Sequence, residues 1–587
     1  MSGLARLGEG VFDLTKAYWK SDERWSARGL LAAVVALNLG LVYVNLQQNV
    51  ATGGVFTALQ QRNGDSFRDA FIVLMALILT YLAVAVMRVF LQQTLELRWR
   101  RWLTDQYLTR WLSYRNFYHL RFSGRVDNPD QRISEDIRLY IEQTMSLGLG
   151  LLNSAATLTS FAALLWSLSG ALTVAVNGFV IVIPGYMFWA AVLYAAAGSI
   201  LAHFIGHPLI RLNYRQQAAE ADFRFSLVRL REEAEGIALY CGEAQERDAA
   251  LGRFRALYDN FTRLIRRNAR YVLFQLLFSQ FAYGFSLLAA SPRYFSGAIE
   301  LGGLVQISNA FERVNEALSW FVGSYAVFAE WRATVARLTE LNLAMGQESA
   351  RVSTGARREV ASADGIELQE LGVALPDGTP LIAPTTLRLV PHQAVLLRGR
   401  SGSGKTTLFR VLAGLWTFTT GGLRMPAHAK TMFLPQQPYM PIGALRDALW
   451  YPARPAKHRD PDARAALTAV GLSEFAARLD EHGHWAQQLS EGEQQRFAIA
   501  RAMLARPHWL FIDEATSAVD EEQEGALYRA LFQALPDTTV VSIGHRSALE
   551  AFHSRVINLE RSAGQPAHLV ERRVGDPTAA MLPNAAS

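Results

Sequence analysis

The chain contains a single cysteine, Cys241, among its 587 residues. A lone cysteine excludes a disulfide within the chain and argues against a metal cluster held by cysteines. Charged residues are also scarce, at 19%, whereas apolar residues make up 50% of the chain. This balance is more apolar than a soluble enzyme needs, and the length indicates several domains.

The scarcity of charged residues is due to a few long segments that contain none. Residues 29–60, 70–87 and 143–210 contain no Asp, Glu, Lys or Arg. The first two can each cross a hydrocarbon core about 30 Å thick, and the third can cross it twice. Apolar runs over residues 271–290 and 295–331 bring the expected number of membrane spans to six. Buried helices of a large soluble domain are the alternative, but the lengths and aromatic flanks favour the membrane.

Basic residues are confined to certain connections. Residues 98–138 and 211–267 are rich in arginine, while the opposite connections carry little beyond Arg62, Arg68 and Arg293. By the positive-inside rule, the two basic segments and the C-terminal half are cytosolic. The net charge of +6 therefore reflects membrane topology. No basic face with interleaved stacking aromatics is evident, so we expect no nucleic-acid partner.

A glycine-rich loop, GRSGSGKTT, follows the strand-like AVLLRG and precedes the helix-like TLFRVLAGL. It matches G-x-x-x-x-G-K-[ST] in the strand, loop, helix context that this motif requires. The backbone N–H groups cradle phosphates, Lys405 supplies a positive charge, and the Thr406 hydroxyl can ligate Mg²⁺. We expect the following residues to bind ATP: Gly399, Ser401, Gly402, Ser403, Gly404, Lys405, Thr406 and Thr407.

A second run, HWLFIDEATSAVD, is a buried-strand pattern that ends in two carboxylates. Asp513 is placed to enter the Mg²⁺ shell, and Glu514 is free to act as general base on water. Taken alone, an ordinary strand with an acidic helix cap would explain the pattern equally well. Gln436 in FLPQQPY can reach metal or water, and His545 in VVSIGHR can contact the γ-phosphate, although an isolated histidine is more often structural.

These elements, together with LSEGEQQR (residues 489–496), resemble in order and spacing the ATPase domain of ABC transporters. The resemblance implies that the signature residues Ser490, Gly492 and Glu493, and Asp520 nearby, serve ATP held by the phosphate loop of a second subunit. Because one chain has one loop and one signature, a dimer follows. The signature departs from the common LSGGQ form at Glu491 and Glu493, and Leu375 replaces an adenine-stacking aromatic, which leaves base selectivity open.

Two cytosolic segments, NPDQRISEDI (residues 128–137) and FRFSLVRLREEAEGIALYCGEAQE (residues 223–246), resemble peroxisomal fatty-acyl (subfamily D) and bacterial SbmA/BacA-like ABC transporters. The resemblance implies a homodimer with the exporter-type (type IV) fold: an all-α, six-helix transmembrane domain followed by an α/β P-loop ATPase domain. It also implies the bacterial inner membrane as location, with a cytoplasmic ATPase domain, and membrane lipid and a transported solute as partners.

The expected domain boundaries follow these patterns. We predict an interfacial helix over residues 1–27, with a disordered leader as the alternative, and a transmembrane domain over residues 28–340. A linker, the ATPase domain and a flexible tail are expected over residues 341–363, 364–575 and 576–587.

The resemblance also bears on transport. Because SbmA/BacA-like relatives take up cobalamin, peptides and other hydrophilic solutes, we expect ATP-driven uptake of a bulky hydrophilic compound. Export of lipid, acyl-CoA or peptide is the first alternative. An ATP-regulated or proton-driven conduit is the second, against which the intact Glu514 and His545 weigh.

The last expected span carries charge at Glu312, Arg313 and Glu316. Charges at membrane depth are costly and face a partner or a wet cavity. Glu312 and Glu316 lie four residues apart, on one helical face, and are therefore candidates for the transport pathway. An internal ion pair with Arg313 is the alternative.

Overall fold

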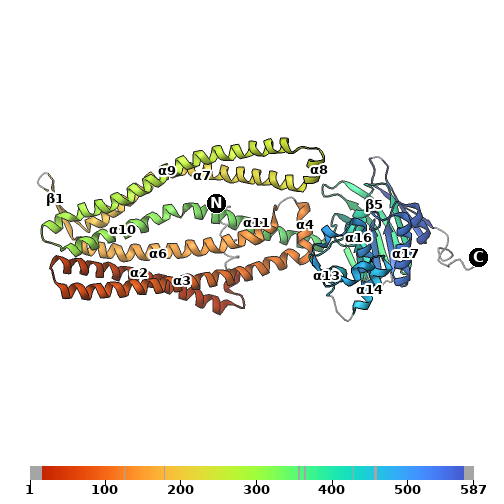
Figure 1. Cartoon of the computed structure of the whole chain (residues 1–587), viewed down its shortest axis with the longest axis horizontal. Coiled ribbons are helices and arrows are strands. Elements are labelled where there is room, and N and C mark those ends of the chain that lie inside the picture. The colour runs from red at the N-terminus through yellow and green to blue at the C-terminus, as the bar shows by residue number, and fades with distance from the viewer. Residues whose placement is uncertain are drawn as a thin grey trace, which may run out of the picture. The chain divides into compact units, whose positions relative to one another are not determined.

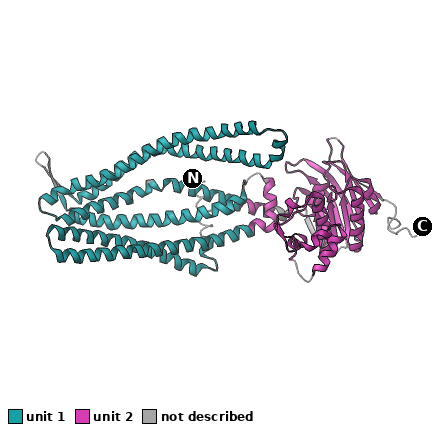
Figure 2. Ribbon diagram, in the orientation of Figure 1, with its two compact units in different colours: residues 1–109, 127–342 teal, residues 110–126, 343–587 magenta. Residues whose placement is uncertain are grey.

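The structure is a computed structural model that describes residues 16–123, 126–176, 179–354, 357–361, 365–427, 429–454, 459–562 and 564–573. The chain forms two compact units (Figure 2). Unit 1 comprises Met1–Thr109 and Asp127–Asn342, and unit 2 comprises Arg110–Val126 and Leu343–Ser587. Residues 1–15 of the expected N-terminal helix and the expected tail, residues 576–587, lie outside the described residues.

Unit 1 is built from long helices (Figure 1). They are α2 (Arg24–Gln60), α3 (Gly64–Leu112), α6 (Ile137–Ser169), α7 (Tyr186–Glu232), α9 (Glu243–Phe295), α10 (Leu301–Gly323) and the first part of α11 (Tyr325–Thr354). Helices α7 and α9 run for 47 and 53 residues. At 1.5 Å per residue they reach about 70–80 Å, far more than a bilayer core requires. These helices therefore extend beyond the membrane, as the basic segments indicate.

Shorter elements join these helices. They are η1 (Ser113–Arg115), α4 (Asn116–Ser123), α5 (Pro129–Gln131), the π-helical segment η2 (Arg132–Asp136), α8 (Ala234–Leu239), and a hairpin of β1 (Ala171–Val176) and β2 (Phe179–Pro184). The hairpin lies within residues 143–210, the charge-free segment expected to cross the membrane twice, and separates its two crossings.

Five helical segments of the described residues are long and apolar enough to cross a membrane. They contain α2, α3, α6, α7 and α9. The sixth expected span, residues 295–331, contains α10, a 23-residue helix that carries Glu312, Arg313 and Glu316, and it is interrupted at Ser324, after which α11 begins. These three charges set α10 apart from the five apolar helices.

The buried centre of unit 1 lies around α10, which contacts α2, α6, α7 and α9. Phe311 and Val314 of α10 are fully buried against Phe161 and Leu165 of α6 and Met187 of α7. By contrast, the apolar window of α3 has no buried residue. An apolar surface exposed along this entire window fits contact with lipid.

The described start of the chain packs on α3. Tyr18 is fully buried and stacks on Trp99, with ring centroids 5.7 Å apart. Trp19 also contacts Trp99, whereas Trp25 is 73% exposed. Tyr18 therefore faces protein, and the placement of this segment on the inner leaflet stays a prediction.

Unit 2 contains two sheets. The six-stranded sheet has the order β14-β13-β6-β12-β11-β8, and the four-stranded sheet has the order β3-β7-β4-β5. The strands β6 (Ala394–Gly399), β12 (Thr539–Ile543), β11 (Trp509–Asp513) and β8 (Thr431–Leu434) pair in parallel. Their carboxyl ends consequently share one edge of the sheet, where ligands bind in open α/β sheets.

The remaining strands complete both sheets. They are β3 (Arg357–Ala361), β4 (Ile366–Ala374), β5 (Pro380–Leu389), β7 (Thr419–Pro426), β13 (Arg555–Glu560) and β14 (His568–Arg573). A small pair, β9 (Gly443–Ala444) with β10 (His482–Gly483), lies apart from them.

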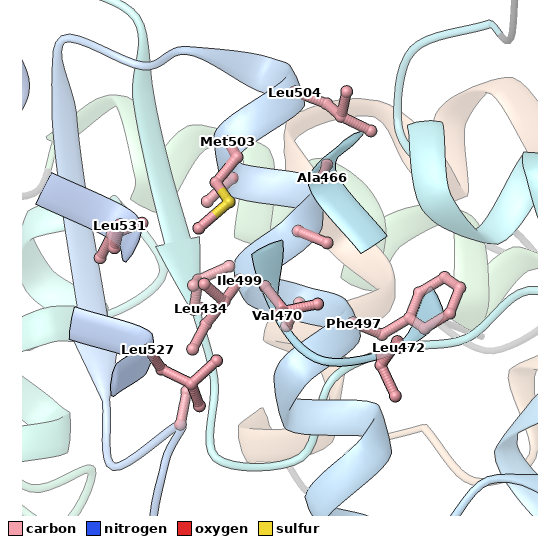
Figure 3. Close-up of a cluster of buried hydrophobic side chains, with 14 of the residues drawn as sticks. Leu434, Ala466, Val470, Leu472, Phe497, Ile499, Met503, Leu504, Leu527 and Leu531 are labelled. Carbon is pink, nitrogen blue, oxygen red and sulfur yellow. The ribbon is translucent and has the colours of Figure 1, made fainter. Parts of the chain in front are cut away.

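Helices cover the sheet and build a helical region beside it. They are α12 (Lys405–Leu412), α13 (Leu445–Trp450), α14 (Asp460–Ala469), α15 (Trp485–Gln488), α16 (Glu491–Ala505), α17 (Glu521–Ala534), η4 (Ser473–Ala477) and η5 (Ser547–Phe552). Figure 3 shows the core that joins α16 to its neighbours: Ile499 and Met503 of α16 lie on the side of Leu434 of β8 and Leu527 of α17, whereas Phe497 lies beside Leu472. The core fixes α16 against the strand ends.

The segment Arg110–Val126, which continues α3, belongs to unit 2. The ring of Phe122 meets Trp416 edge-on at 5.3 Å, and Arg115 donates to the carbonyl of Ala413. Both partners closely follow α12, the helix that begins at the phosphate loop. A chain segment continuous with a membrane helix is thus packed next to the nucleotide elements.

In unit 1, two arginines tie the region before α6 to α11. Arg337 donates from Nε and Nη2 to the two carboxylate oxygens of Asp136, both at 2.7 Å, and the Asp136 side chain is only 7% exposed. Arg132, which is 6% exposed, donates to Asp127 at 2.7 Å and to Glu340 at 2.8 Å. Because Arg132 and Asp136 bound the π-helical segment, the network holds an irregular stretch of backbone in place.

We predict that Arg337→Leu destabilises unit 1 by about 1–3 kcal/mol, because it leaves the buried Asp136 carboxylate without its charged partner while Arg337 itself is partly exposed. Thermal unfolding of the purified protein measures the loss. Arg138→Leu, which removes an exposed pair with Glu142, is the control and should have little effect. The double variant Asp136→Leu/Arg337→Leu should recover most of the loss, and a double variant as unstable as Arg337→Leu would contradict the explanation.

Candidate nucleotide site

The phosphate loop connects β6 to α12 in the conformation expected for a phosphate cradle. Gly402 and Gly404 have φ values of 78° and 105°, in the region that glycine favours. A Cβ on Gly399 would lie 2.6 Å from the carbonyl oxygen of Leu559 on β13, so this position admits only glycine. The loop places backbone N–H groups at the start of α12, where an anion is stabilised.

Lys405 and Ser403 fit a phosphate group. The Lys405 ammonium donates to the carbonyls of Gly399 at 2.8 Å and Arg400 at 3.2 Å, and burial lowers its pKa. The Ser403 hydroxyl is buried without a hydrogen-bond partner among the described residues. Unsatisfied buried polar groups are rare in folded proteins, so this hydroxyl agrees with a site that accepts further polar groups.

Thr406 and Asp513 come together although they lie far apart in the sequence. The Thr406 hydroxyl donates to Asp513 Oδ1 at 3.2 Å, and burial raises the pKa of Asp513. Gln436 lies two residues beyond β8, whose Leu434 pairs with Ile512, and it therefore reaches the same sheet edge. A hydroxyl, a carboxylate and an amide are the oxygen donors that Mg²⁺ prefers.

Glu514 and His545 lie next to this group. Glu514 has φ 50°, which turns the chain directly after β11. Its Oε1 lies 3.0 Å from Nε2 of His545, which follows β12 and is half exposed. Because β11 and β12 are parallel neighbours, their ends deliver a carboxylate and an imidazole to one point. The structure thus brings the two candidate catalytic residues into contact.

Ser490 begins the signature helix α16 as its N-cap. Its side chain accepts from the N–H of Glu493 at 3.3 Å, while the Glu493 carboxylate accepts from the N–H and hydroxyl of Ser490, each at 2.8 Å. This capping box stabilises the helix start. A Cβ on Gly492, in the first turn, would lie only 3.2 Å from the carbonyl oxygen of Ala518. The signature is therefore packed closely on the segment that precedes Asp520.

Asp520 has a local structural role. It is the N-cap of α17, and its side chain accepts from the N–H of Gln523 at 2.8 Å. The cap orients the SAVD segment, Ser517 to Asp520, at the start of that helix. The expected contact of Asp520 with a second subunit stays a prediction.

Sequence reasoning missed Gln495, in the middle of LSEGEQQR. Gln495 is 3% exposed. Its Oε1 accepts from the N–H of Ala518 at 2.9 Å, and its Nε2 donates to Ser517 Oγ and to the Gln436 carbonyl, each at 3.2 Å. One side chain thus joins the signature helix, the SAVD segment and the Gln436 loop. Its place within the motif was the only sequence signal.

Arg546 was also missed. It donates to the carbonyl of Val519 at 2.8 Å and to the buried carboxylate of Glu524 at 3.1 Å. Since Arg546 directly follows His545, these bonds fix the histidine loop to the SAVD segment. An arginine next to the expected histidine carried no distinct pattern in the sequence.

Three further expected positions are Leu375, Glu312 and Glu316. Leu375 is half buried against the core of unit 2 and, as an aliphatic residue, offers no aromatic face to a base. Glu312 and Glu316 lie on α10 in unit 1, where Arg313 pairs with Glu316 at 3.0 Å. Both side chains of that pair are substantially exposed, at 48% and 61%, so it is not a buried ion pair.

Comparison with known proteins gives the family. Residues 14–295 match the family described as ABC transporter transmembrane region 2, and residues 382–517 match the family described as ABC transporter. The inner membrane ABC transporter ATP-binding protein YddA of Escherichia coli is 33% identical, over 91% of this chain and 94% of that protein. The human lysosomal cobalamin transporter ABCD4 is 27% identical, over 91% and 92%.

A solved structure shares the fold. A bacterial Atm1-family ABC exporter with ATP bound superposes with a TM-score of 0.72 at 17% identity, over 94% of this chain and 96% of that chain. This similarity confirms the predicted exporter-type fold, in which a helical membrane region precedes an α/β nucleotide-binding domain.

The chain is a membrane ABC transporter, with a transmembrane region and an ATPase domain fused in one polypeptide. More specifically, it belongs with the half transporters of subfamily D. It binds ATP and couples ATP hydrolysis to transport.

We predict that Gln495→Ala lowers ATPase activity at least tenfold while ATP binding stays near that of the wild type. The change leaves the N–H of Ala518 unpaired and removes the bonds that join three elements, at a cost in folding free energy of about 1–3 kcal/mol for the unpaired group. The phosphate loop is untouched. Steady-state hydrolysis and a nucleotide titration on the full-length protein measure the two effects. Gln487→Ala, at an exposed position, is the control, and unchanged hydrolysis in Gln495→Ala would contradict the connecting role.

Proposed function

We propose that the chain is an ATP-driven importer of a bulky hydrophilic solute that works as a homodimer in the bacterial inner membrane, with its ATPase domain in the cytoplasm. The observation that carries the ATPase part is the meeting of Lys405, Thr406, Asp513, Glu514 and His545 at one edge of the parallel sheet. The cargo and direction rest on the relatives.

Each residue has a role that its position supports. Lys405 and the loop amides, from Gly399 to Thr407, hold the phosphates, and Thr406, Asp513 and Gln436 would hold Mg²⁺. When bound, Mg²⁺ would neutralise charge on the β- and γ-phosphates. Glu514 accepts a proton from the attacking water, and His545 orients Glu514 through the 3.0 Å contact and faces the γ-phosphate.

The dimer follows from the separation of loop and signature. A single chain carries one phosphate loop and one signature at Ser490. In the proposed dimer, Ser490, Gly492, Glu493 and Asp520 complete the site on the partner's phosphate loop. The start of α16 suits this task, because a helix N-terminus attracts phosphate.

Motion in unit 2 has a physical route to the membrane helices. The segment that continues α3 is packed on Trp416 and Ala413, just beyond α12. When nucleotide orders the phosphate loop, displacement of α12 is therefore passed to that segment. The contiguous packing is the basis for coupling hydrolysis to movement of α3.

Two observations favour a hydrophilic cargo. Among the relatives, ABCD4 is a cobalamin transporter. Glu312, Arg313 and Glu316 also give α10 a charged face within the membrane unit, which favours a wet route over a lipid slot. Export of lipid, acyl-CoA or peptide is the alternative direction, and an ATP-regulated or proton-driven conduit is the alternative mechanism.

Transport in vesicles tests the proposal. Full-length protein is reconstituted so that ATP reaches the ATPase domain from outside, and movement of cobalamin, a peptide and an acyl-CoA across the membrane is followed with and without a protonophore. Import in the cell corresponds to export from these vesicles, dependent on ATP and indifferent to the protonophore. Accumulation of acyl-CoA inside them instead, or transport abolished by the protonophore, would favour the alternatives.

We predict that Glu514→Gln slows ATP hydrolysis by about 10²–10⁴-fold with ATP binding retained, because the amide cannot accept the proton of water. Lys405→Ala should instead weaken nucleotide binding itself. A hydrolysis assay and a nucleotide titration distinguish the two variants. Near-normal turnover in Glu514→Gln would show that another group is the base.

Mixed dimers test whether Ser490 serves the partner. We expect a dimer of one Ser490→Arg chain with one Lys405→Ala chain to keep one intact site, because both lesions then fall in the same composite site. A dimer with both lesions on one chain should have none. ATP trapping in purified mixed dimers measures this, and trapping only when the lesions share a chain would show that each chain uses its own signature.

A further inference from the structure

Unit 1 contains a cavity of about 450 Å³ between α6 and the junction of α10 with α11. The junction falls at Ser324, where one helix ends and the next begins. Five aromatic side chains line the cavity: Trp320, Phe321, Tyr325, Phe328 and Trp331. The volume and the aromatic lining are those of a small-molecule site.

The aromatic wall is held in place by specific contacts. Trp331 donates from Nε1 to the hydroxyl of Thr144 at 2.8 Å, and its ring stacks on Phe328 with centroids 5.7 Å apart. Trp320 closes over Gly150, where a Cβ would lie 2.8 Å from its Nε1. The polar atom of Trp331 is thereby satisfied by the wall itself, and Phe321, Tyr325 and Phe328 remain 48–62% exposed.

On α10, the helix that contributes Trp320 and Phe321 to the cavity, negative charges outnumber positive charges. No Lys, Arg, Asp or Glu lines the cavity among the described residues. Glu316 precedes Trp320 by four residues on the continuous helix α10, a rise of about 6 Å. Arg313 is paired with Glu316, and Glu312 forms no ion pair within the described part of the chain. α10 therefore carries one carboxylate in excess, at Glu312, eight residues or about 12 Å of helix rise before Trp320.

We infer that this cavity binds an organic cation with a bulky or flat apolar body. The π-faces of tryptophan, tyrosine and phenylalanine attract cations and provide apolar contact area. The excess carboxylate of Glu312 favours positive charge and opposes an anion such as an acyl-CoA head group. That such a ligand is the cargo, or the cationic part of a larger polar cargo, rests on the proposed transport function; that the cavity binds it does not.

The cavity can be filled without removing any wall residue. Gly148 lines the cavity, and a Cβ added there meets nothing within 4 Å. Gly148→Leu therefore places a side chain in the ligand space and leaves the packing of α6 intact. Gly284→Leu, at an equally open glycine of α9 outside the cavity, is the matched control.

The test uses three probes of similar shape and different charge: tetraphenylphosphonium, tetraphenylborate and triphenylphosphine oxide. Calorimetric titration of the full-length protein in detergent, with empty micelles as blank, gives each Kd. We expect tetraphenylphosphonium to bind at least tenfold more tightly than tetraphenylborate. We expect Gly148→Leu to weaken it at least tenfold and Gly284→Leu to leave it unchanged. Glu312→Gln should weaken the cation about three- to tenfold and leave the neutral probe unaffected.

Each other result overturns part or all of the inference. Equal affinity for the two ions would refute the selection for cations. Binding that Gly148→Leu does not change would place the probe in the detergent micelle or elsewhere on the protein. Thermal unfolding and basal ATPase, measured on the same samples, show whether a variant is folded. Transport of a polar solute without tetraphenylphosphonium binding would reject this inference alone, and binding without any such transport would reject the proposed function alone.

Discussion

The parallel pairing of β6, β12, β11 and β8 is the constraint on which the nucleotide site depends. It brings Gly399, Asp513, Ile543 and Leu434 to the ends of neighbouring strands, so that the residues that follow them emerge at one edge. The residues of the site are separated by up to 146 positions in sequence, from Gly399 in the phosphate loop to His545. No single segment could hold them within hydrogen-bonding distance without this register, and a one-residue slip would turn each side chain to the other face.

Helix α16 connects the signature at its N-terminus to the segments at this edge of the sheet. Its first residues form the capped signature, and Gln495, one turn further on, is bonded to the Gln436 loop and to the SAVD segment. The buried residues Phe497, Ile499 and Met503 then anchor the helix in the core. A change at Gln436 or Ser517 is therefore passed to the signature through hydrogen bonds rather than through loose loops, which suits a site that a second chain is expected to complete.

The sequence predicts best the features whose physics is local. The phosphate loop requires glycine at fixed offsets, and Asp513 and Glu514 are marked by the apolar strand before them, so the sequence alone identifies these positions. The exporter-type fold was predicted through resemblance and is confirmed. Gln495, Arg546 and the Asp136–Arg337 pair could not be predicted, because their importance comes from partners 22 to 201 residues away. The β1–β2 pairing and the break at Ser324 were likewise not marked by the apolar periodicity of the sequence.

The charges of α10 are explained by the two faces of this helix. Phe311 and Val314 point into the core of unit 1 and are fully buried, while Arg313 and Glu316 on another face are about half exposed. A helix surrounded by lipid could not keep three charged residues at little cost, but α10 contacts four other helices and turns only part of its surface away from them. The exposed part runs from Glu312 and Glu316 to Trp320 and the aromatic cavity beyond it. A strip that changes from acidic to aromatic along one helix can hold a ligand that is both charged and apolar. The acidic part alone would not distinguish such a ligand from a simple ion, and the aromatic part alone would not distinguish it from a lipid.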